Sequence, residues 1–125
     1  MILLLLSINI FSCINKQYEC KSDEECINNF IKHEIKNTNY DYIILCFDSD
    51  CEDSFYEKMG IINQTICNKE NALIIHFCNP NTVKLNNVSA CEIRYFHYDV
   101  AEKYDIYFNM IKVFKKNTKD IYIMQ

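Results

Sequence analysis

Glycine, proline and tryptophan are nearly missing from this chain of 125 residues, which contains one glycine (Gly60), one proline (Pro80) and no tryptophan. Because chain reversals usually draw on glycine and proline, we expect its turns to be built from asparagine, aspartate and serine. Asparagine, isoleucine, lysine, tyrosine and phenylalanine are abundant instead. An AT-rich coding sequence also produces this composition, so part of it reflects codon supply.

The motifs of several enzyme classes are also missing. The chain has no Cys-x-x-Cys redox motif, no glycine-rich phosphate loop and no Gly-x-Ser-x-Gly elbow. Its histidines, His33, His76 and His97, are scattered; His76 lies two residues from Cys78, but a cysteine–histidine dyad also needs an orienting third group. The acidic residues around position 50 lack the glycine and the distal glutamate of a calcium loop, so we interpret them as a solvated turn. We therefore expect no enzymatic activity.

Basic residues are absent from the apolar segment at the start of the chain, residues 1–11, in which Ser7 and Asn9 are the only polar side chains. A membrane-spanning helix needs about 18 or more apolar residues, so this segment is too short to be one. We interpret residues 1–12 as a signal peptide, although the usual leader begins with a positive charge. A buried N-terminal strand or helix is the alternative.

The eight cysteines raise the question of where such a leader ends. Cleavage after Ser12 leaves Cys13 at the new N-terminus and an even number of cysteines that can pair completely. Cleavage one residue later leaves seven, and a lipid-modified Cys13 of the bacterial lipoprotein type is a third option. A secretory leader delivers a chain to an oxidising compartment, where disulfides stabilise domains with small cores. We expect a secreted protein with a disulfide-held surface.

Charge divides the chain into two parts. Residues 13–58 contain five lysines and eleven acidic residues, a net charge of −6, whereas residues 59–125 contain eight basic and six acidic residues, a net charge of +2. Only the second part can attract an anionic surface. Its lysines at positions 112, 115, 116 and 119 lie among hydrophobic residues, which favours a solvated helix face over a nucleic-acid patch.

The first half of the chain predicts a helix followed by a strand. Ser22-Asp23-Glu24-Glu25 has the form of a capping box, and apolar residues then recur at three- and four-residue intervals, which predicts a helix over about residues 23–36. Asparagines at positions 37 and 39 end it. The continuous apolar run 42–47 predicts a strand, and residues 48–50 a turn that leads to Cys51.

In the second half, residues 72–77 and 92–97 are candidate strands. Val100, Tyr104, Tyr107, Ile111 and Phe114 follow a four-three-four-three spacing that favours an amphipathic helix with an aromatic core-facing stripe. If the chain contacts a membrane, we expect residues 104–119 to do so as an interfacial helix. Two glycosylation sequons begin at Asn63 and Asn87.

We expect Cys20, Cys26, Cys46 and Cys51 to form two disulfides, because a unit of about thirty residues buries too little apolar surface to fold unaided. Four cysteines allow three pairings, and the connectivity stays open.

A family resemblance rests on the same cysteines. The segment Cys20-Lys21-Ser22-Asp23-Glu24-Glu25-Cys26, followed after nineteen residues by Cys46-Phe47-Asp48-Ser49-Asp50-Cys51-Glu52, resembles the four-cysteine form of the late nodulins, the nodule-specific cysteine-rich peptides of legumes. The resemblance covers residues 1 to about 54. It implies a non-enzymatic peptide secreted to the symbiotic compartment of nodule cells, where it acts on components of the bacterial symbiont.

The resemblance also implies binding of a divalent metal ion by Cys20, Cys26, Cys46 and Cys51. Four thiolates can hold an ion such as zinc in a tetrahedron, but the same sulfur atoms are consumed as disulfides in an oxidising compartment. The residues by themselves favour disulfides, so any metal binding is expected only after reduction. No other cofactor and no nucleic-acid partner is expected.

These observations predict a small disulfide-rich α+β fold. Residues 13–54 would form a late-nodulin-like module with a cysteine-stabilised helix and short strands, and residues 55–125 a largely helical extension of uncertain status. The alternative is a larger, mostly helical secreted binding protein or effector that uses all eight cysteines, acts on another extracellular protein and comes from an AT-rich invertebrate or parasite.

Overall fold

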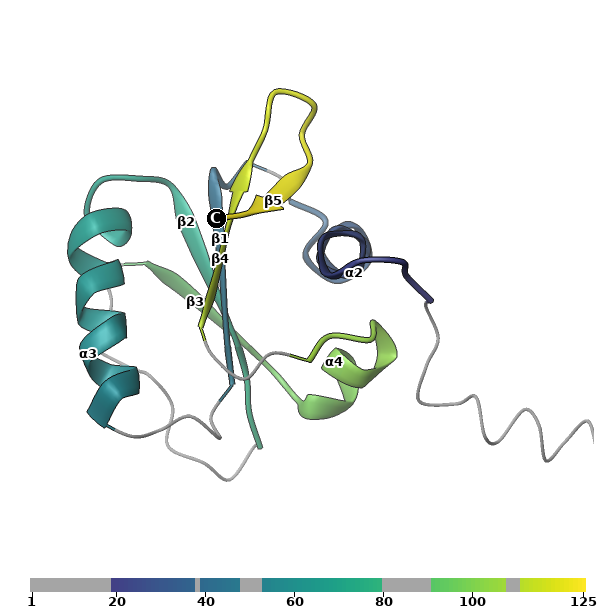
Figure 1. Ribbon diagram of the computed structural model, residues 1–125, viewed down its shortest axis with the longest axis horizontal. Helices are drawn as coiled ribbons and strands as arrows, with labels where there is room; N and C mark the ends of the chain where they lie inside the picture. The colour runs from purple at the N-terminus through teal and green to yellow at the C-terminus, as the bar shows by residue number, and fades with distance from the viewer. Residues whose placement is uncertain (1–18, 38, 48–52, 80–90, 108–110) are drawn as a thin grey trace, which may run out of the picture.

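The computed structural model describes residues 19–37, 39–47, 53–79, 91–107 and 111–125, and for residues 53–56 the backbone alone. Within these ranges one mixed sheet of five strands forms the centre of the molecule (Figure 1), in the order β3-β2-β1-β4-β5. The strands are β1 (Tyr42–Phe47), β2 (Ala72–Phe77), β3 (Glu92–Phe96), β4 (Lys112–Lys116) and β5 (Tyr122–Met124). Strands β1, β2 and β3 run parallel to one another, and β4 and β5 complete the sheet in antiparallel pairings.

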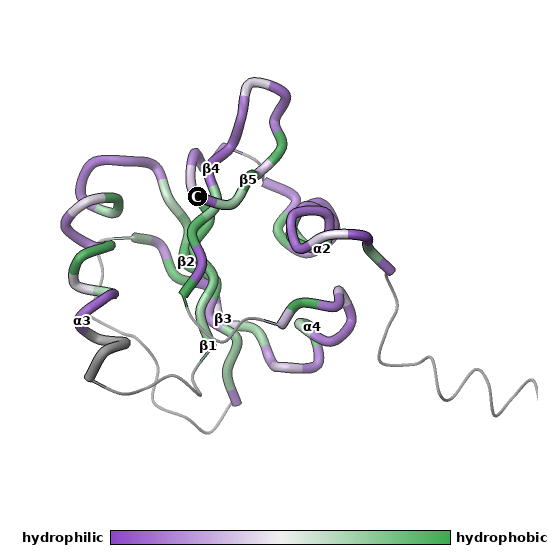
Figure 2. The backbone as a smooth tube through the Cα atoms, in the orientation of Figure 1, coloured by the Kyte–Doolittle hydropathy of each residue, from purple (hydrophilic) through white to green (hydrophobic). Residues whose placement is uncertain are grey.

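Helices cover both faces of this sheet (Figure 1). Helix α3 (Asp53–Ile62), which continues as the π-helical segment η3 (Asn63–Cys67), lies on one face. The other face carries α2 (Asp23–Phe30), its π-helical continuation η1 (Ile31–Ile35) and the short α4 (Tyr98–Lys103). Parallel strands covered on both faces are expected to be continuously hydrophobic. Figure 2 shows this along β1 and β2, and every residue of β2 is buried.

The central strand β1 supplies side chains to two separate cores. Ile43, Leu45 and Phe47 pack with α2, η1 and α4, whereas Ile44 and Cys46 pack with Met59 of α3. Successive residues of a strand point to opposite faces, so this division follows from the period of two. We call these the α2 face and the α3 face of the sheet.

Helix α2 begins where the sequence predicts it. The Ser22 hydroxyl oxygen accepts a hydrogen bond from the Glu25 N–H at 3.2 Å, and the Glu25 carboxylate accepts one from the Lys21 N–H at 3.1 Å. The Ser22 side chain thus satisfies one N–H of the first turn, and the Glu25 carboxylate binds the N–H one residue before the N-cap, one position earlier than in an ideal capping box. The predicted helix over residues 23–36 is confirmed as α2 and η1, and the strands predicted at 42–47, 72–77 and 92–97 are confirmed as β1, β2 and β3.

The helix predicted from the aromatic spacing between residues 100 and 114 is wrong. Helix α4 ends at Lys103, and β4 pairs antiparallel with β1, so that Phe114 lies opposite Ile43. Tyr104 and Phe114 are both fully buried on the α2 face, but they reach it from different elements. The proposed interfacial helix over residues 104–119 therefore loses its basis. In the part of the chain that the structure describes, no helix has both the length and the apolar character to cross a bilayer.

The expected fold class is confirmed only in its coarse form, a small α/β domain with disulfides. The finer expectation of a cysteine-stabilised helix with short strands and a helical extension is wrong. Strand β1 lies between β2 and β4, both of which come from residues after position 54. The predicted module 13–54 and the predicted extension 55–125 therefore share one continuous sheet. Residues 55–125 contribute four of its five strands.

The scarcity of glycine is visible at three turns, where Lys36, Asp105 and Asp120 adopt positive φ angles of 65°, 60° and 60°. Lys36 follows η1 and its N–H donates to the Ile31 carbonyl at 2.8 Å, which ends the helical segment. A side chain in this left-handed conformation costs about 1 kcal/mol relative to glycine.

Lys36→Gly should therefore raise the free energy of unfolding by about 0.5–1 kcal/mol. Lys32→Gly is the matched control: it also removes an exposed lysine, but from within the helical segment, and should lower stability by about 1 kcal/mol. Urea denaturation of both variants measures the difference. Equal destabilisation by the two substitutions would contradict the left-handed cap.

Candidate functional site

The described residues form two disulfides, one on each face of the sheet. Cys20–Cys26 joins the residues around the start of α2, with Cα atoms 5.4 Å apart; Cys26 belongs to the α2-face core and Cys20 packs against it. Cys67–Cys91 joins the end of η3 to the segment before β3, with Cα atoms 4.8 Å apart, and packs against the α3-face core.

These pairs differ from the expected set of Cys20, Cys26, Cys46 and Cys51. Cys20 is joined to Cys26, which is one of the three pairings left open, whereas Cys46 takes part in neither described disulfide, and Cys51 and Cys13 lie outside the described residues. Cys46 is fully buried, and its Sγ lies 3.8 Å from the Ile75 carbonyl oxygen. The pairing of Cys67 with Cys91, which are 24 residues apart, depends on the register of β2 and β3 and left no local signal in the sequence.

The four-thiolate metal site implied by the family resemblance does not fit this arrangement. Cys20 and Cys26 pack on the α2 face, whereas Cys46 points to the α3 face beside Met59 and Ile74. A tetrahedral ion holds all its ligand atoms within about 4 Å of one another, which sulfur atoms on opposite faces of a sheet cannot satisfy. We therefore correct that expectation: Cys46 does not share a site with Cys20 and Cys26.

A different set of ligand-bearing groups does converge, at the start of α2. The sulfur atoms of Cys20 and Cys26 and a carboxylate oxygen of Asp105 all lie within 4.8 Å of one another. Cys26 is 3% exposed, and Cys20 and Asp105 are partly exposed. We call these three residues the Cys20–Cys26–Asp105 cluster. Sequence reasoning missed Asp105 because it lies 79 residues after Cys26 and nothing in its local pattern marks it.

Asp105 is held in place by the end of α4. With Asp105 in the left-handed conformation, the Ile106 N–H donates to the Ala101 carbonyl at 2.9 Å, which is the long bond of a Schellman motif. The preceding residue, Tyr104, is fully buried, and its hydroxyl donates to the Glu34 carboxylate at 2.6 Å. Lys103 Nζ lies 3.7 Å from the same carboxylate. These contacts fix the end of α4 against η1 and hence Asp105 beside the two cysteines.

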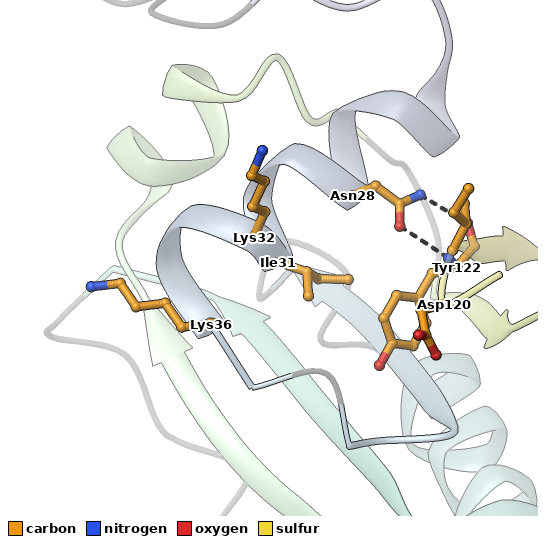
Figure 3. A pocket seen from close by; sticks show the side chains of 7 residues that line it. Asn28, Ile31, Lys32, Lys36, Asp120 and Tyr122 are labelled. Carbon is orange, nitrogen blue, oxygen red and sulfur yellow. Dashed lines mark hydrogen bonds between the residues drawn. The ribbon is translucent and has the colours of Figure 1, made fainter.

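A groove of about 310 Å³ lies between α2–η1 and the turn before β5 (Figure 3). Its lining residues are Asn28, Ile31, Lys32, Lys36, Asp120, Ile121 and Tyr122. The Asn28 side chain accepts from the Tyr122 N–H at 2.9 Å and donates to the Tyr122 carbonyl at 3.0 Å, so its amide is used to hold the outer edge of β5. Glu24 adds an acceptor for the Met124 N–H at 3.2 Å.

The charged groups of the groove stand at its rim. Figure 3 shows the Lys32 and Lys36 side chains pointing away from Tyr122, and Lys116 Nζ lies 3.9 Å from the Asp120 carboxylate. The Tyr122 hydroxyl donates to the Tyr40 carbonyl at 2.5 Å. The polar groups of the floor are thus occupied by structural hydrogen bonds, which leaves the rim lysines and the exposed Ile121 to contact other molecules.

The three histidines lie in separate places. His76 is fully buried on the α3 face, in register with Cys46 and Tyr95 on the neighbouring strands, and its ring is 5.6 Å from that of Tyr95. His97 caps α4, where its Nδ1 accepts from the Asp99 N–H at 3.2 Å. The ring of His33 packs edge-on to Tyr104 at 6.3 Å. Packing and capping account for these contacts.

A small charged network spans the α2 face between Tyr40 and β3. The Tyr40 hydroxyl donates to the Glu92 carboxylate at 2.7 Å, and Arg94 Nε donates to the same oxygen at 3.0 Å. The Tyr40 hydrogen bond and the Arg94 charge hold the pKa of Glu92 below its usual value, whereas burial raises the pKa of Tyr40. Glu92 is half exposed, so we interpret the network as a support for the edge strand β3.

Of the two predicted glycosylation sites, the structure describes the one at Asn63. Asn63 begins the helical segment η3 and is partly buried, while the Thr65 hydroxyl of the same sequon donates to the Ile61 carbonyl at 2.8 Å. Asn87 lies outside the described residues. Asn63 and Cys67 begin and end η3, so a glycan on Asn63 would lie about one helical turn from the Cys67–Cys91 disulfide.

No protein-family model, curated protein or solved structure matches this chain.

Proposed function

We propose that this chain is a secreted, non-enzymatic binding protein whose functional unit is the whole α/β domain. The observation that carries the proposal is the placement of one disulfide on each face of a single sheet. Disulfides that secure a domain in this way persist in oxidising compartments and are reduced in the cytosol. The apolar leader in residues 1–11 supports the same destination.

The whole chain, rather than a late-nodulin-like peptide, is favoured as this unit by the position of β1. Its backbone is hydrogen-bonded on both sides to strands from residues 72–77 and 112–116. Both edges of β1 would expose unpaired N–H and C=O groups if residues 13–54 stood alone. A partner outside the cell, such as another extracellular protein, is therefore proposed to contact the whole domain, with the exposed groove residues Lys32, Lys36 and Ile121 as candidate contacts.

Expression of the chain with its own leader in eukaryotic cells tests the proposal. We expect residues 13–125 in the medium, and peptide mapping without reduction should recover Cys20 linked to Cys26 and Cys67 linked to Cys91. Retention inside the cell, with Cys67 and Cys91 both alkylated as thiols, would contradict the proposal.

A fragment of residues 13–58 serves as the comparison within the same experiment. Because β1 then lacks both neighbours, the fragment should give the circular dichroism of an unfolded chain and show no amides protected from exchange. A stably folded, secreted fragment would instead favour the late-nodulin-like peptide.

A further inference from the structure

We propose that Cys20, Cys26 and Asp105 form a redox-gated site for a zinc-class divalent ion, which becomes available when the Cys20–Cys26 disulfide is reduced. This site goes beyond the binding function proposed above and involves none of the groove residues. It also differs from the four-cysteine set, because it replaces the thiols of Cys46 and Cys51 by the carboxylate of Asp105.

The first support is geometric. Zinc binds thiolate sulfur at about 2.3 Å and carboxylate oxygen at about 2.0–2.2 Å, so ligand atoms around a tetrahedral ion lie about 3.5–3.8 Å apart. The two sulfur atoms and the Asp105 oxygen already lie within 4.8 Å of one another. Breaking the sulfur–sulfur bond would free both sulfur atoms to rotate about their χ1 angles, with the Asp105 oxygen already within reach. Three protein ligands leave the fourth position of the tetrahedron to water.

The second support is the rigidity of the three segments that carry the ligands. Cys26 lies in the first turn of α2 and is almost fully buried, and Asp105 is held by the Schellman motif at the end of α4. Cys20 packs against the α2-face core, and its Sγ lies 4.0 Å from the Tyr104 carbonyl oxygen. Ligands on fixed backbone lose little conformational freedom on binding an ion.

Two electrostatic effects near the cluster oppose each other in their action on the thiolates. The N-terminus of α2 carries a partial positive charge, which favours the thiolate form of a nearby cysteine. The acidic residues of its first turn, Asp23, Glu24 and Glu25, oppose the thiolates and favour a bound cation. Two thiolates and a carboxylate carry three negative charges, so a divalent ion removes most of their mutual repulsion.

The redox step requires a dithiol reductant. Such a reductant is oxidised to its own disulfide and supplies two electrons and two protons, which break the Cys20–Cys26 bond and yield two thiols. Binding of the ion then releases the two thiol protons to solvent, because thiolate is the ligand form. In the oxidised protein the sulfur atoms are bonded to each other and only Asp105 remains as a ligand.

Zinc titration of the full mature chain, before and after dithiol reduction, tests the proposal, with a chelating dye as competitor and Co²⁺ absorption as a report of thiolate ligation. We expect binding only after reduction. Asp105→Asn should weaken zinc affinity of the reduced chain at least about tenfold, and Cys20→Ser should do the same. Asp120→Asn is the matched control, because Asp120 has the same φ of 60° and does not belong to the cluster, and its affinity should equal that of the parent chain.

Several outcomes would overturn the proposal. Equal zinc affinity in the oxidised and reduced chains would show that the cysteines are not ligands. Equal affinity in the parent chain and in Asp105→Asn, with both folded by circular dichroism, would remove Asp105 from the site. Because other thiols are also reduced, binding that survives Cys20→Ser unchanged would assign the ion elsewhere. Loss in Asp105→Asn and Cys20→Ser but not in Asp120→Asn supports the site.

Discussion

Phe30→Ala is expected to lower the free energy of unfolding by about 3–5 kcal/mol. Phe30 is fully buried at the end of α2, and its ring meets three other aromatic rings edge-on: Phe77 at 5.5 Å, Phe96 at 5.1 Å and Tyr104 at 5.5 Å between centroids. These partners come from β2, β3 and the end of α4. Loss of the ring therefore leaves a cavity where helix and sheet meet, and edge-on aromatic contacts are lost as well.

Urea denaturation followed by circular dichroism measures this effect. Ile61→Ala is the control, because Ile61 is 56% exposed on α3 and its truncation should change stability by no more than about 0.5 kcal/mol. Phe30→Leu should fall between the two, since it restores part of the lost volume. A loss below 1 kcal/mol in Phe30→Ala would show that the α2 face is not packed as described.

Alkaline pH is expected to destabilise the protein through Tyr122. Burial, followed by the charges of Asp41 and Asp120, raises the pKa of Tyr122 to about 12, and its side chain is 1% exposed. In the unfolded chain the hydroxyl titrates near pH 10. Below pH 10 both states are neutral at this position and its contribution to stability is complete. Between pH 10 and 12 the unfolded state ionises more than the folded state, so stability falls by roughly 2 kcal/mol over this range.

Comparison with Tyr122→Phe isolates this contribution. The variant lacks the hydroxyl that donates to the Tyr40 carbonyl and should be about 1–3 kcal/mol less stable at pH 7. Its stability should then fall less steeply than that of the parent chain from pH 10 to 12. Tyr107→Phe, at a residue 64% exposed, should leave both values unchanged. Identical slopes in the parent chain and Tyr122→Phe would contradict a buried, hydrogen-bonded hydroxyl.

Elements encoded by short stretches of sequence were predicted well. The capping residues Ser22 and Glu25 and the three- and four-residue spacing that follows define α2 and η1, because every interaction involved lies within one or two turns. The apolar runs at 42–47 and 72–77 became β1 and β2 because a run of that length has no polar face to leave in water. The expectation that aspartate would serve in turns holds at Asp105 and Asp120, which take left-handed positions, whereas the left-handed Lys36 was not expected.

The failures share a cause, which is dependence on residues far apart in the chain. The aromatic spacing from 100 to 114 mimicked a helix because Tyr104 and Phe114 enter the same core from two elements. The conformation of residues 112–116 is decided by pairing with β1, about 70 residues earlier, and local periodicity does not contain that information. The Cys20–Cys26–Asp105 cluster is another case, because Asp105 meets the cysteines only when α4 packs against η1.

The sequence by itself determined the helix that begins after Ser22, the positions of the strands at 42–47, 72–77 and 92–97, and the capacity for disulfides, because each depends on neighbouring residues or on composition. The tertiary structure alone decided that one sheet unites both halves, that Cys67 pairs with Cys91, and that Cys46 and Cys26 lie on opposite faces. A strand places successive side chains on alternate faces, but the neighbours it meets there are set by sheet order and helix packing. Sheet order and helix packing depend on how much apolar surface the whole chain buries, and no short segment of the sequence contains that information.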